Sequence, residues 1–243
     1  MVGWSDRRTE NRLAGSAVRL SDGPTVRLMY ALMWSGGKDS CLALARVRRQ
    51  GLAVETLVNF YDAATGRVRF HATRRELIAA QAFALGLRLI QEATKPDTYE
   101  AVFRRTLTQL AASGCRGVAF GDIHLADVRS WFEERVTGAG LEHVEPLWDN
   151  PPAQLLSEFI DGGFQAVLTC VELAKLPAAW LGRLVDEALA TDLARLPDVD
   201  PCGERGEYHT FVFGGPLFSV PVLWRPGPIH EQNGFAQLEL LPR

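Results

Sequence analysis

The stretch VRLMYALMW-SGGKDS, residues 26–40, decides the fold, because an apolar run ends abruptly in a turn that contains two glycines. The run over 26–34 is typical of a buried strand, and the pattern of 38–50 predicts a helix that ends at Gly51. Two glycines let the backbone turn sharply and bring its N–H groups close to an anion. The new helix adds its own free N–H groups and the positive end of its dipole. The turn therefore predicts a phosphate-binding loop.

The side chains of this loop suit the same ligand. Lys38 supplies a point charge for phosphate oxygens, and Ser35 and Ser40 supply hydroxyl groups. Asp39 lies in the first helical turn, where a carboxylate caps amides or holds a metal ion. Lys38 is also one of only three lysines among 26 basic residues, which are otherwise arginines. The alternative is a tight glycine turn with a capping serine and no ligand.

Strands and helices alternate along the first 150 residues. We expect further strands at 54–61, 87–91, 117–121 and 144–148, and helices at 73–85, 97–113 and 126–138. Asp97 and Glu100 are spaced as a capping box. The alternation predicts a Rossmann-like parallel five-stranded sheet with helices on both faces, over residues 27–150. Residues 1–26 are polar, arginine-rich and without periodicity, so we expect a disordered leader there.

The chain after the proline pair at 151–152 has a different character. We expect helices at 153–160 and 178–189, a strand at 166–171, and short antiparallel strands at 210–213, 220–223 and 236–240. This pattern predicts a smaller C-terminal α+β module over residues 151–243, in which a substrate other than the nucleotide binds.

Composition excludes several classes of protein. Asp+Glu number 29 and Lys+Arg 26, and the resulting net charge of −3 argues against a nucleic-acid partner held by bulk electrostatics. No apolar run is long enough to span a bilayer, and the N-terminus lacks the apolar core of a signal peptide. Four cysteines without CxxC spacing predict neither a disulfide framework nor a zinc ribbon. We therefore expect a cytoplasmic α/β enzyme or binding protein without a membrane partner. A homodimer stays open.

Two other places carry residues suited to chemistry. Asp122 follows the strand predicted at 117–121, on the edge where open α/β sheets bind ligands, and is expected to hold Mg²⁺ or a substrate amine. Its alternative is an N-cap for the next helix. Glu204, Glu207 and His209 cluster in a glycine-rich segment and can hold Mg²⁺, grip an amine or act as bases. Their alternative is a solvated acidic turn.

The SGGKDS loop resembles the pyrophosphate loop of the N-type ATP pyrophosphatases, which are α/β enzymes of the HUP class. Further motifs resemble the diphthine–ammonia ligase family over residues 28–218, namely Gly121-Asp122-Ile123, Arg129-x-Trp131-x-Glu133, Pro146-Leu147-Trp148 and Asp200-x-Cys202-Gly203-Glu204-x-Gly206-Glu207-Tyr208-His209-Thr210. The resemblance implies a ligase that adenylates a carboxylate with ATP and then amidates it with ammonia. The acceptor in that family is a modified histidine on a translation elongation factor, and the cofactors are ATP and Mg²⁺.

The resemblance also implies roles for individual residues. ATP is expected to bind Ser35, Gly36, Gly37, Lys38, Asp39, Ser40, Asn59, Phe60 and Gly121. Mg²⁺ is expected at Asp39 and Asp122. The catalytic residues are expected to be Lys38, Asp122, Glu204 and Glu207. The acceptor is expected to bind His71, Arg129, Glu133, Gly203, Tyr208 and His209.

Several of these positions keep an alternative. Asn59 and Phe60 are also compatible with ordinary packing at a strand end, and Arg129 and Glu133 with an ion pair on a helix face. Cys202 is either a nucleophile or a buried inert thiol. Two other functions stay open. One is an RNA sulfurtransferase of the same superfamily, with a catalytic cysteine and a basic tRNA surface. The other is a nucleotide-binding regulatory protein without turnover.

Overall fold

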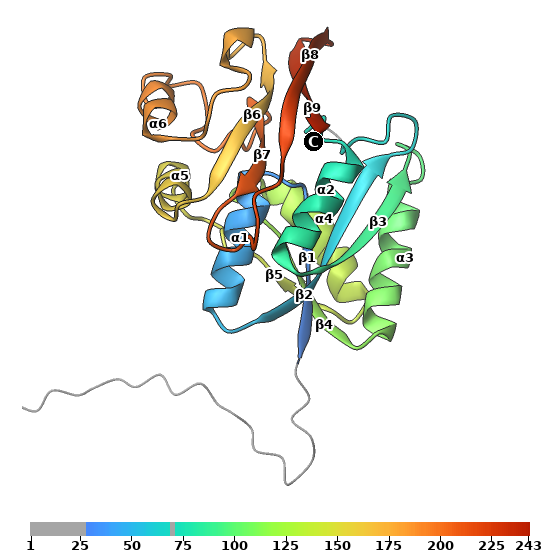
Figure 1. Ribbon diagram of the computed structural model, residues 1–243. Helices are drawn as coiled ribbons and strands as arrows, with labels where there is room; N and C mark the ends of the chain where they lie inside the picture. The colour runs from blue at the N-terminus through green and yellow to red at the C-terminus, as the bar shows by residue number, and fades with distance from the viewer. Residues whose placement is uncertain (1–27, 69–70) are drawn as a thin grey trace, which may run out of the picture.

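A computed structural model describes residues 28–68 and 71–243. It contains a five-stranded parallel sheet in the order β3-β2-β1-β4-β5 (Figure 1). The strands are β1 (Met29–Met33), β2 (Ala53–Asp62), β3 (Arg88–Thr94), β4 (Cys115–Ala119) and β5 (Glu142–Val144). The predicted five-stranded parallel sheet is thus confirmed. The leader predicted at 1–26 lies outside the described residues.

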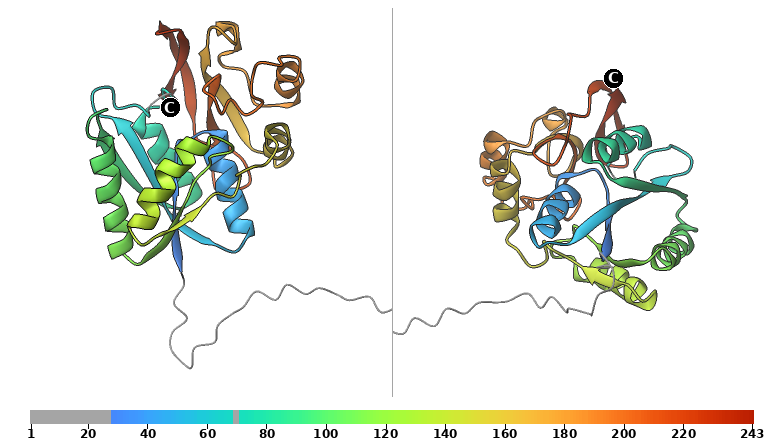
Figure 2. Two further views of the ribbon diagram at one scale, coloured as in Figure 1. Left: turned by 180° about the vertical axis from the view of Figure 1, so that it is seen from behind. Right: turned by 60° about the horizontal axis from the view of Figure 1, so that its bottom comes forward.

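Helices cover both faces of this sheet, as predicted (Figure 2). They are α1 (Lys38–Arg49), α2 (Arg75–Leu85), α3 (Tyr99–Ala112) and α4 (Ala126–Gly138). Buried side chains alternate along the strands. Leu32 of β1 belongs to the apolar cluster that contains α1 and α2, whereas its neighbour Ala31 belongs to the cluster that contains α3 and α4. This period of two is what a sheet buried on both faces requires.

A second, antiparallel sheet follows in the order β7-β6-β9-β8. Its strands are β6 (Gln165–Glu172), β7 (Tyr208–Gly214), β8 (Trp224–Gln232) and β9 (Phe235–Pro242). Two helices, α5 (Pro152–Asp161) and α6 (Glu187–Leu193), accompany it, together with the single-turn 3₁₀ helix η1 (Ala178–Trp180). The smaller C-terminal α+β module is therefore present. Within the described residues no helix combines the length and the apolar character that a membrane span requires.

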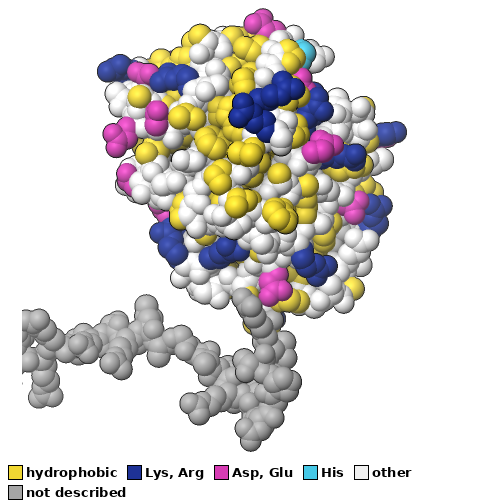
Figure 3. Space-filling view, in the orientation of Figure 1, with side chains coloured by type: hydrophobic (Ala, Val, Ile, Leu, Met, Phe, Trp, Pro, Cys, Tyr) yellow, Lys and Arg dark blue, Asp and Glu magenta, His cyan; other side chains and the backbone are white. Residues whose placement is uncertain are grey.

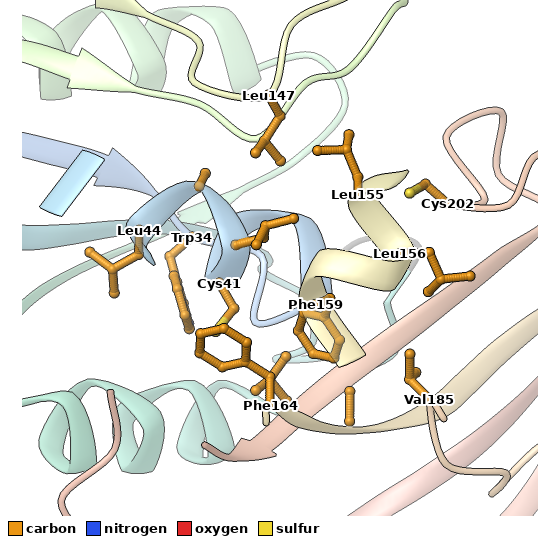
Figure 4. Packing of buried hydrophobic residues seen from close by; sticks show 14 of the residues in the cluster. Trp34, Cys41, Leu44, Leu147, Leu155, Leu156, Phe159, Phe164, Val185 and Cys202 are labelled. Carbon is orange, nitrogen blue, oxygen red and sulfur yellow. The ribbon is translucent and has the colours of Figure 1, made fainter. Parts of the chain in front are cut away.

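One apolar cluster joins the two sheets. It runs from Trp34 and Leu44 through Leu155 and Phe159 of α5 to Phe164, beside the start of β6 (Figure 4). Helix α1 contacts both α5 and β7, so one of its sides packs on the parallel sheet and the other on the C-terminal module. The side chains that fill this interface are buried. The two modules therefore share one core.

The helix predicted over 178–189 is wrong. Only η1 forms at its start, and α6 begins after Asp186, whose side chain accepts the Leu189 N–H at 2.9 Å. Gly182 lies between them at a φ of +81°, a left-handed value that ends a helix. The backbone there pairs with β6 instead, because the Gly182 N–H donates to Leu168 O at 3.0 Å.

Three smaller expectations are also corrected. The strand predicted at 220–223 is irregular, and β8 begins at Trp224, in a segment whose two prolines hid it from pattern analysis. The fifth strand lies at 142–144, before Pro146, rather than at 144–148. The capping box is absent, because Thr98 is the N-cap of α3 and the Glu100 carboxylate pairs with Arg104 at 2.9 Å.

We expect Gln81→Leu to lower the free energy of unfolding by about 2–3 kcal/mol, because buried polar groups lose their partners. Gln81 is fully buried on α2; it accepts from Trp34 Nε1 at 2.8 Å and donates to Gly36 O at 2.9 Å and Val212 O at 2.6 Å. Urea denaturation measures the loss. Gln109→Leu, on the exposed side of α3, is the control and should change stability by less than about 0.5 kcal/mol. Equal losses in both variants would contradict this role for Gln81.

Candidate active site

A cavity of about 440 Å³ lies at the carboxyl ends of the strands of the parallel sheet. Its walls come from the loops after β1, β2 and β4 and from the segment 203–210 that leads into β7. This is the edge at which open α/β sheets bind ligands. Most of the predicted site residues line it, so segments that lie far apart in sequence meet in one place.

The predicted phosphate loop forms one wall, although Gly36 and Gly37 themselves are not among the residues that line the cavity. Gly36 has a φ of +85°, and a Cβ there would lie 2.5 Å from the Ile78 side chain, so only glycine fits. A Cβ on Gly37 would lie 3.0 Å from the His71 ring. The N-cap Gly37 has no side chain, and the Lys38 N–H, in the first turn of α1, donates to Thr210 Oγ1 at 3.0 Å. This first turn lines the cavity, so the helix N-terminus can serve there as an anion site.

Hydroxyl groups and a further glycine complete this wall. Ser40 Oγ donates to Gly37 O at 3.0 Å and lies 3.3 Å from Ser35 Oγ. Gly121, after β4, packs against the first turn of α1, where a Cβ would lie 3.0 Å from Ser40 N. Backbone and hydroxyl donors are thus gathered at one end of the cavity.

The ammonium group of Lys38 is buried between the two modules. Its Nζ lies 2.9 Å from Asp39 Oδ2, donates to Cys202 O, and sits 4.9 Å above the centre of the Tyr208 ring. Burial disfavours the charged form, but the Asp39 carboxylate outweighs it and the pKa of Lys38 lies above its ordinary value. Lys38 is therefore a permanent positive charge at the edge of the cavity.

Three carboxylates, those of Asp39, Asp122 and Glu204, gather near this charge. Burial, reinforced by the charge of Asp39, raises the pKa of Asp122 to about 6 and that of Glu204 to about 8. Burial also raises the pKa of Asp39, which its ion pair with Lys38 opposes. The Glu204 carboxylate is held by the Ile123 N–H at 2.9 Å, one residue after Asp122. The cluster is short of positive charge.

This donor set fits a magnesium ion that arrives with a nucleotide. Among the described residues no group of three or more His, Cys, Asp or Glu side chains is arranged to hold a metal by itself. Mg²⁺ in nucleotide sites usually takes one or two carboxylates, with phosphate oxygens and water as the remaining ligands. Asp39 and Asp122 match that need, and a cation beside them would relieve the repulsion that raises the pKa of Asp122.

The other end of the cavity is apolar. It is lined by Val58 and Phe60 of β2, Tyr99 of α3 and Phe132 of α4, and the Phe60 and Tyr99 rings meet edge to face at 5.4 Å. Asn59 also borders it, but its amide is engaged with Trp34 O at 2.8 Å and Gln91 Nε2 at 3.3 Å. An aromatic slot of this kind suits a flat base, with Asn59 holding the wall in place.

Two histidines cover the phosphate loop. The rings of His71 and His209 lie 4.5 Å apart, and His71 Nδ1 is 3.4 Å from Thr210 O. Burial lowers the pKa of His71 to about 4 and that of His209 well below its ordinary value. Both rings are therefore neutral at pH 7, and they can form hydrogen bonds with a bound substrate or stack on it.

Not every predicted residue reaches the cavity. Glu207 is buried, and its carboxylate accepts the N–H groups of Asp200 at 2.9 Å and Arg205 at 3.1 Å. It shapes the loop that carries Gly203 and Glu204, which do line the cavity. The catalytic role predicted for Glu207 does not fit this placement, because both of its oxygens are directed at backbone.

Arg129 and Glu133 also lie outside the cavity lining. Arg129 Nε is 3.8 Å from Glu133 Oε2 but 2.9 Å from Oε2 of Glu145, and its guanidinium covers the Trp148 ring at 4.5 Å. The pair is thus part of a second polar cluster next to the cavity. Sequence analysis missed Glu145, although it adjoins the Pro146-Leu147-Trp148 motif.

A pair between the two modules was also missed. His124 Nε2 lies 2.6 Å from Asp200 Oδ2, and Asp200 Oδ1 accepts the Cys202 N–H at 2.7 Å. With the Glu204 contact to Ile123, two polar contacts tie the loop after β4 to the C-terminal segment. Asp200 was quoted only as part of a motif, and no pattern in the sequence pairs it with His124.

The surroundings of Cys202 match the alternative of a buried, inert thiol. Its thiol is buried, donates to Pro152 O at 3.2 Å, and has a pKa that burial raises to about 12. All four cysteines are free. A thiol at this pKa supplies almost no thiolate at pH 7, so Cys202 is a poor nucleophile.

Two family models match the chain. The Diphthamide synthase N-terminal domain matches residues 28–143, and the Diphthamide synthase C-terminal domain matches residues 151–238. The curated relatives that it resembles are named diphthine–ammonia ligase. The Danio rerio protein is 27% identical over 233 residues, which cover 85% of this chain and 91% of the relative. The Homo sapiens protein is 25% identical over 240 residues, or 88% of this chain and 90% of the relative.

Two further likenesses are more limited. The Schizosaccharomyces pombe diphthine–ammonia ligase is 28% identical over 223 residues, which cover 82% of this chain but 36% of that longer protein. Among solved structures, the U34-tRNA thiolase NcsA from Methanococcus maripaludis aligns over 56% of this chain and 58% of that chain, with a TM-score of 0.37 and 16% identity. That last likeness is too low to bear on function.

The raised pKa of Glu204 predicts a loss of stability as pH rises. Its carboxyl has an ordinary pKa of 4.5 and a folded-state value of about 8, so its contribution is full below pH 4.5 and is lost as pH rises to about 8. We expect Glu204→Gln, which cannot ionise, to be more stable than the wild type by about 1–3 kcal/mol near pH 9 and similar near pH 5. Urea denaturation at both pH values measures this. Glu231→Gln, exposed in β8, is the control, and a pH-independent difference for Glu204→Gln would contradict the assignment.

Proposed function

The chain belongs to the diphthamide synthase family, and we propose on that basis that it is a diphthine–ammonia ligase. The reaction has two steps in one cavity. The acceptor carboxylate attacks the α-phosphorus of ATP, the α–β bond breaks, and pyrophosphate leaves. Ammonia then attacks the acyl carbon of the adenylate, and AMP leaves as the amide forms.

The observation that carries this proposal is the composition of the cavity. A helix N-terminus with a glycine turn, a charged lysine and three carboxylates meet at one end, and an aromatic slot lies at the other. Transfer of an adenylyl group needs each of these parts. Phosphates need donors and a cation, a base needs a flat apolar slot, and the leaving pyrophosphate needs charge stabilisation that grows in the transition state.

Each group of ATP can be assigned to one part of the cavity. We assign the β- and γ-phosphates to Ser35–Ser40, the α-phosphate to the backbone at Gly121, and adenine to the slot beside Phe60. Asp39 and Asp122 would hold Mg²⁺. When bound, that ion would neutralise charge on the phosphate oxygens. Lys38, whose Nζ lies 2.9 Å from Asp39 Oδ2, would add a positive charge beside them.

The acceptor is assigned to the C-terminal side of the cavity. Gly203, Tyr208 and the neutral rings of His71 and His209 line it there, next to the phosphate loop. Glu204 lies between this side and Asp122, where a carboxyl with a pKa near 8 can exchange a proton with an amine during amidation. An acceptor on a translation factor would place the enzyme in the cytoplasm.

The sulfurtransferase alternative has little support. It needs a reactive cysteine, and Cys202, which adjoins the lining residue Gly203, has a pKa that burial raises to about 12 and so stays protonated. It also needs a basic surface for tRNA. On the face seen in Figure 3, arginine and lysine side chains are interspersed with acidic ones rather than gathered into a stripe. No observation on the described residues favours a regulator without turnover.

The products of the reaction test the proposal. With ATP, ammonium and a diphthine-bearing acceptor protein, we expect AMP and pyrophosphate in equal amounts with the amidated acceptor. Ion-exchange chromatography separates the nucleotides, and mass spectrometry measures the amidation. The control omits the acceptor and should yield little AMP. ADP and phosphate as the main products would overturn the proposal.

We expect Lys38→Ala to slow acceptor-dependent AMP formation, because one charge donor to the leaving pyrophosphate is lost. The loss corresponds to about 2–3 kcal/mol of transition-state stabilisation. Lys38→Arg should not restore the rate, since the slot between Cys202 O and the Tyr208 ring is filled by a compact ammonium group. Initial rates at saturating ATP measure both variants. Lys95→Ala, at an exposed position, is the control. Wild-type turnover by either Lys38 variant would remove Lys38 from the mechanism.

A further inference from the structure

A second polar cluster lies beside the cavity without lining it. His143 belongs to β5, Glu145 follows the end of that strand, and Arg129 comes from the first half of α4. The side chains of His143 and Glu145 are only 4% and 3% exposed. The His143 ring packs on Phe120 with centroids 4.8 Å apart, and Phe120 lines the cavity. One aromatic ring therefore separates this cluster from the nucleotide site.

Three atoms of this cluster lack hydrogen-bond partners. They are His143 Nε2, Glu145 Oε1 and Glu145 Oε2, and they make up the full set of such buried side-chain atoms in the part of the chain that the structure describes. His143 Nε2 lies 3.4 Å from Glu145 Oε1. Arg129 Nε lies 2.9 Å from Glu145 Oε2, an ion pair whose geometry is not that of a hydrogen bond. Buried polar atoms are rarely left in this state.

The chemistry of the three atoms points to a donor as the missing partner. An ionised carboxylate only accepts, and Nε2 of a neutral imidazole accepts when the proton is on Nδ1. Burial lowers the pKa of His143, so the ring is neutral at pH 7. A small ligand with several N–H groups would satisfy all three atoms.

The charges around Glu145 favour a cation over water. Burial and the charge of Asp122 raise the pKa of Glu145 to about 7, Arg129 lowers it, and Glu133 raises it further. Glu133 and Glu145 therefore share one guanidinium, and the charge of Asp122 adds to theirs. A positive ligand would add attraction as well as hydrogen bonds, whereas water would supply only the bonds.

We propose that His143 and Glu145 form the binding site for ammonium, the nitrogen substrate of the ligase. This inference rests on the proposed function. Ammonium gives one proton to the Glu145 carboxylate. The remaining ammonia forms the C–N bond with the acyl carbon, and the acyl C–O bond breaks with its electron pair leaving on AMP. The phosphate of the departing AMP takes the second proton from the nitrogen. Asp122 borders the cavity and its charge acts on Glu145, so the proposed ammonium site adjoins the site of amidation.

The test compares Glu145→Gln with the wild type in three assays. ATP–pyrophosphate exchange with the diphthine-bearing acceptor reports adenylation, and amidation over a range of ammonium chloride concentrations gives the KM for ammonium. Amidation with hydroxylamine at pH 7 uses a nucleophile that is already neutral. We expect the variant to raise the KM for ammonium by about tenfold or more, with exchange and the hydroxylamine reaction changed by less than about twofold. Glu134→Gln, exposed on α4 and paired with Arg135 at 3.3 Å, is the matched control.

Each other outcome overturns the inference. A wild-type KM for ammonium in Glu145→Gln would mean that the cluster holds only water. Loss of ATP–pyrophosphate exchange would place Glu145 in the nucleotide site or the fold, and loss of the hydroxylamine reaction would give it a role other than ammonium capture. His143→Gln provides a second variant and should raise the same KM. If the wild type itself shows no acceptor-dependent exchange, the proposed function fails instead.

Discussion

The buried ammonium group of Lys38 is the contact on which the whole site depends. Removing such a charge from water costs several kcal/mol unless nearby groups replace the lost hydration. Here the replacements are Asp39, one residue away, and the carbonyl of Cys202, 164 residues away. The phosphate loop is therefore stable in this form only when the C-terminal segment packs against it. Thr210, which accepts the Lys38 N–H at 3.0 Å, reinforces the same junction.

The charges of the carboxylates near Lys38, in contrast, are not fully compensated by nearby groups. Asp122 and Glu204 are buried near the charge of Asp39, and burial and that charge raise the pKa of both. Such an arrangement weakens the protein without ligand, and the catalytic use of the site explains why it is kept. Magnesium and ammonium are the two cations that the proposed reaction brings to this region, so substrate binding would supply the charge that the folded chain lacks.

Much of this architecture is predictable from local patterns. The apolar run before residues 35–40, the helix end at Gly51 and the alternation of strands and helices each follow from backbone preferences over short windows. The structure confirms them, with Gly51 in the left-handed conformation just after α1. Element types failed where tertiary pairing overrode propensity, as at Gly182, where the chain joins β6 instead of continuing a helix.

Side-chain roles within the motifs were harder to predict. Glu204 and Glu207 belong to one motif and look equivalent, yet one faces the cavity and the other accepts two backbone N–H groups. Which of them turns inward depends on how the loop closes over Tyr208. Glu145 was missed for a related reason. Its burial arises from the packing of α4 beside β5, and nothing in the neighbouring residues predicts that its carboxylate will lack partners.

The shared core also has a consequence for synthesis on the ribosome. Trp34 and α1 bury their apolar atoms against α5 and β7. The Lys38 ammonium group donates to the carbonyl of Cys202, which is synthesised much later. A nascent chain that has emerged only as far as β5 exposes this surface and has an incomplete nucleotide pocket. The apolar side of α1 therefore stays exposed to water until α5 and β7 have left the exit tunnel and can pack on it.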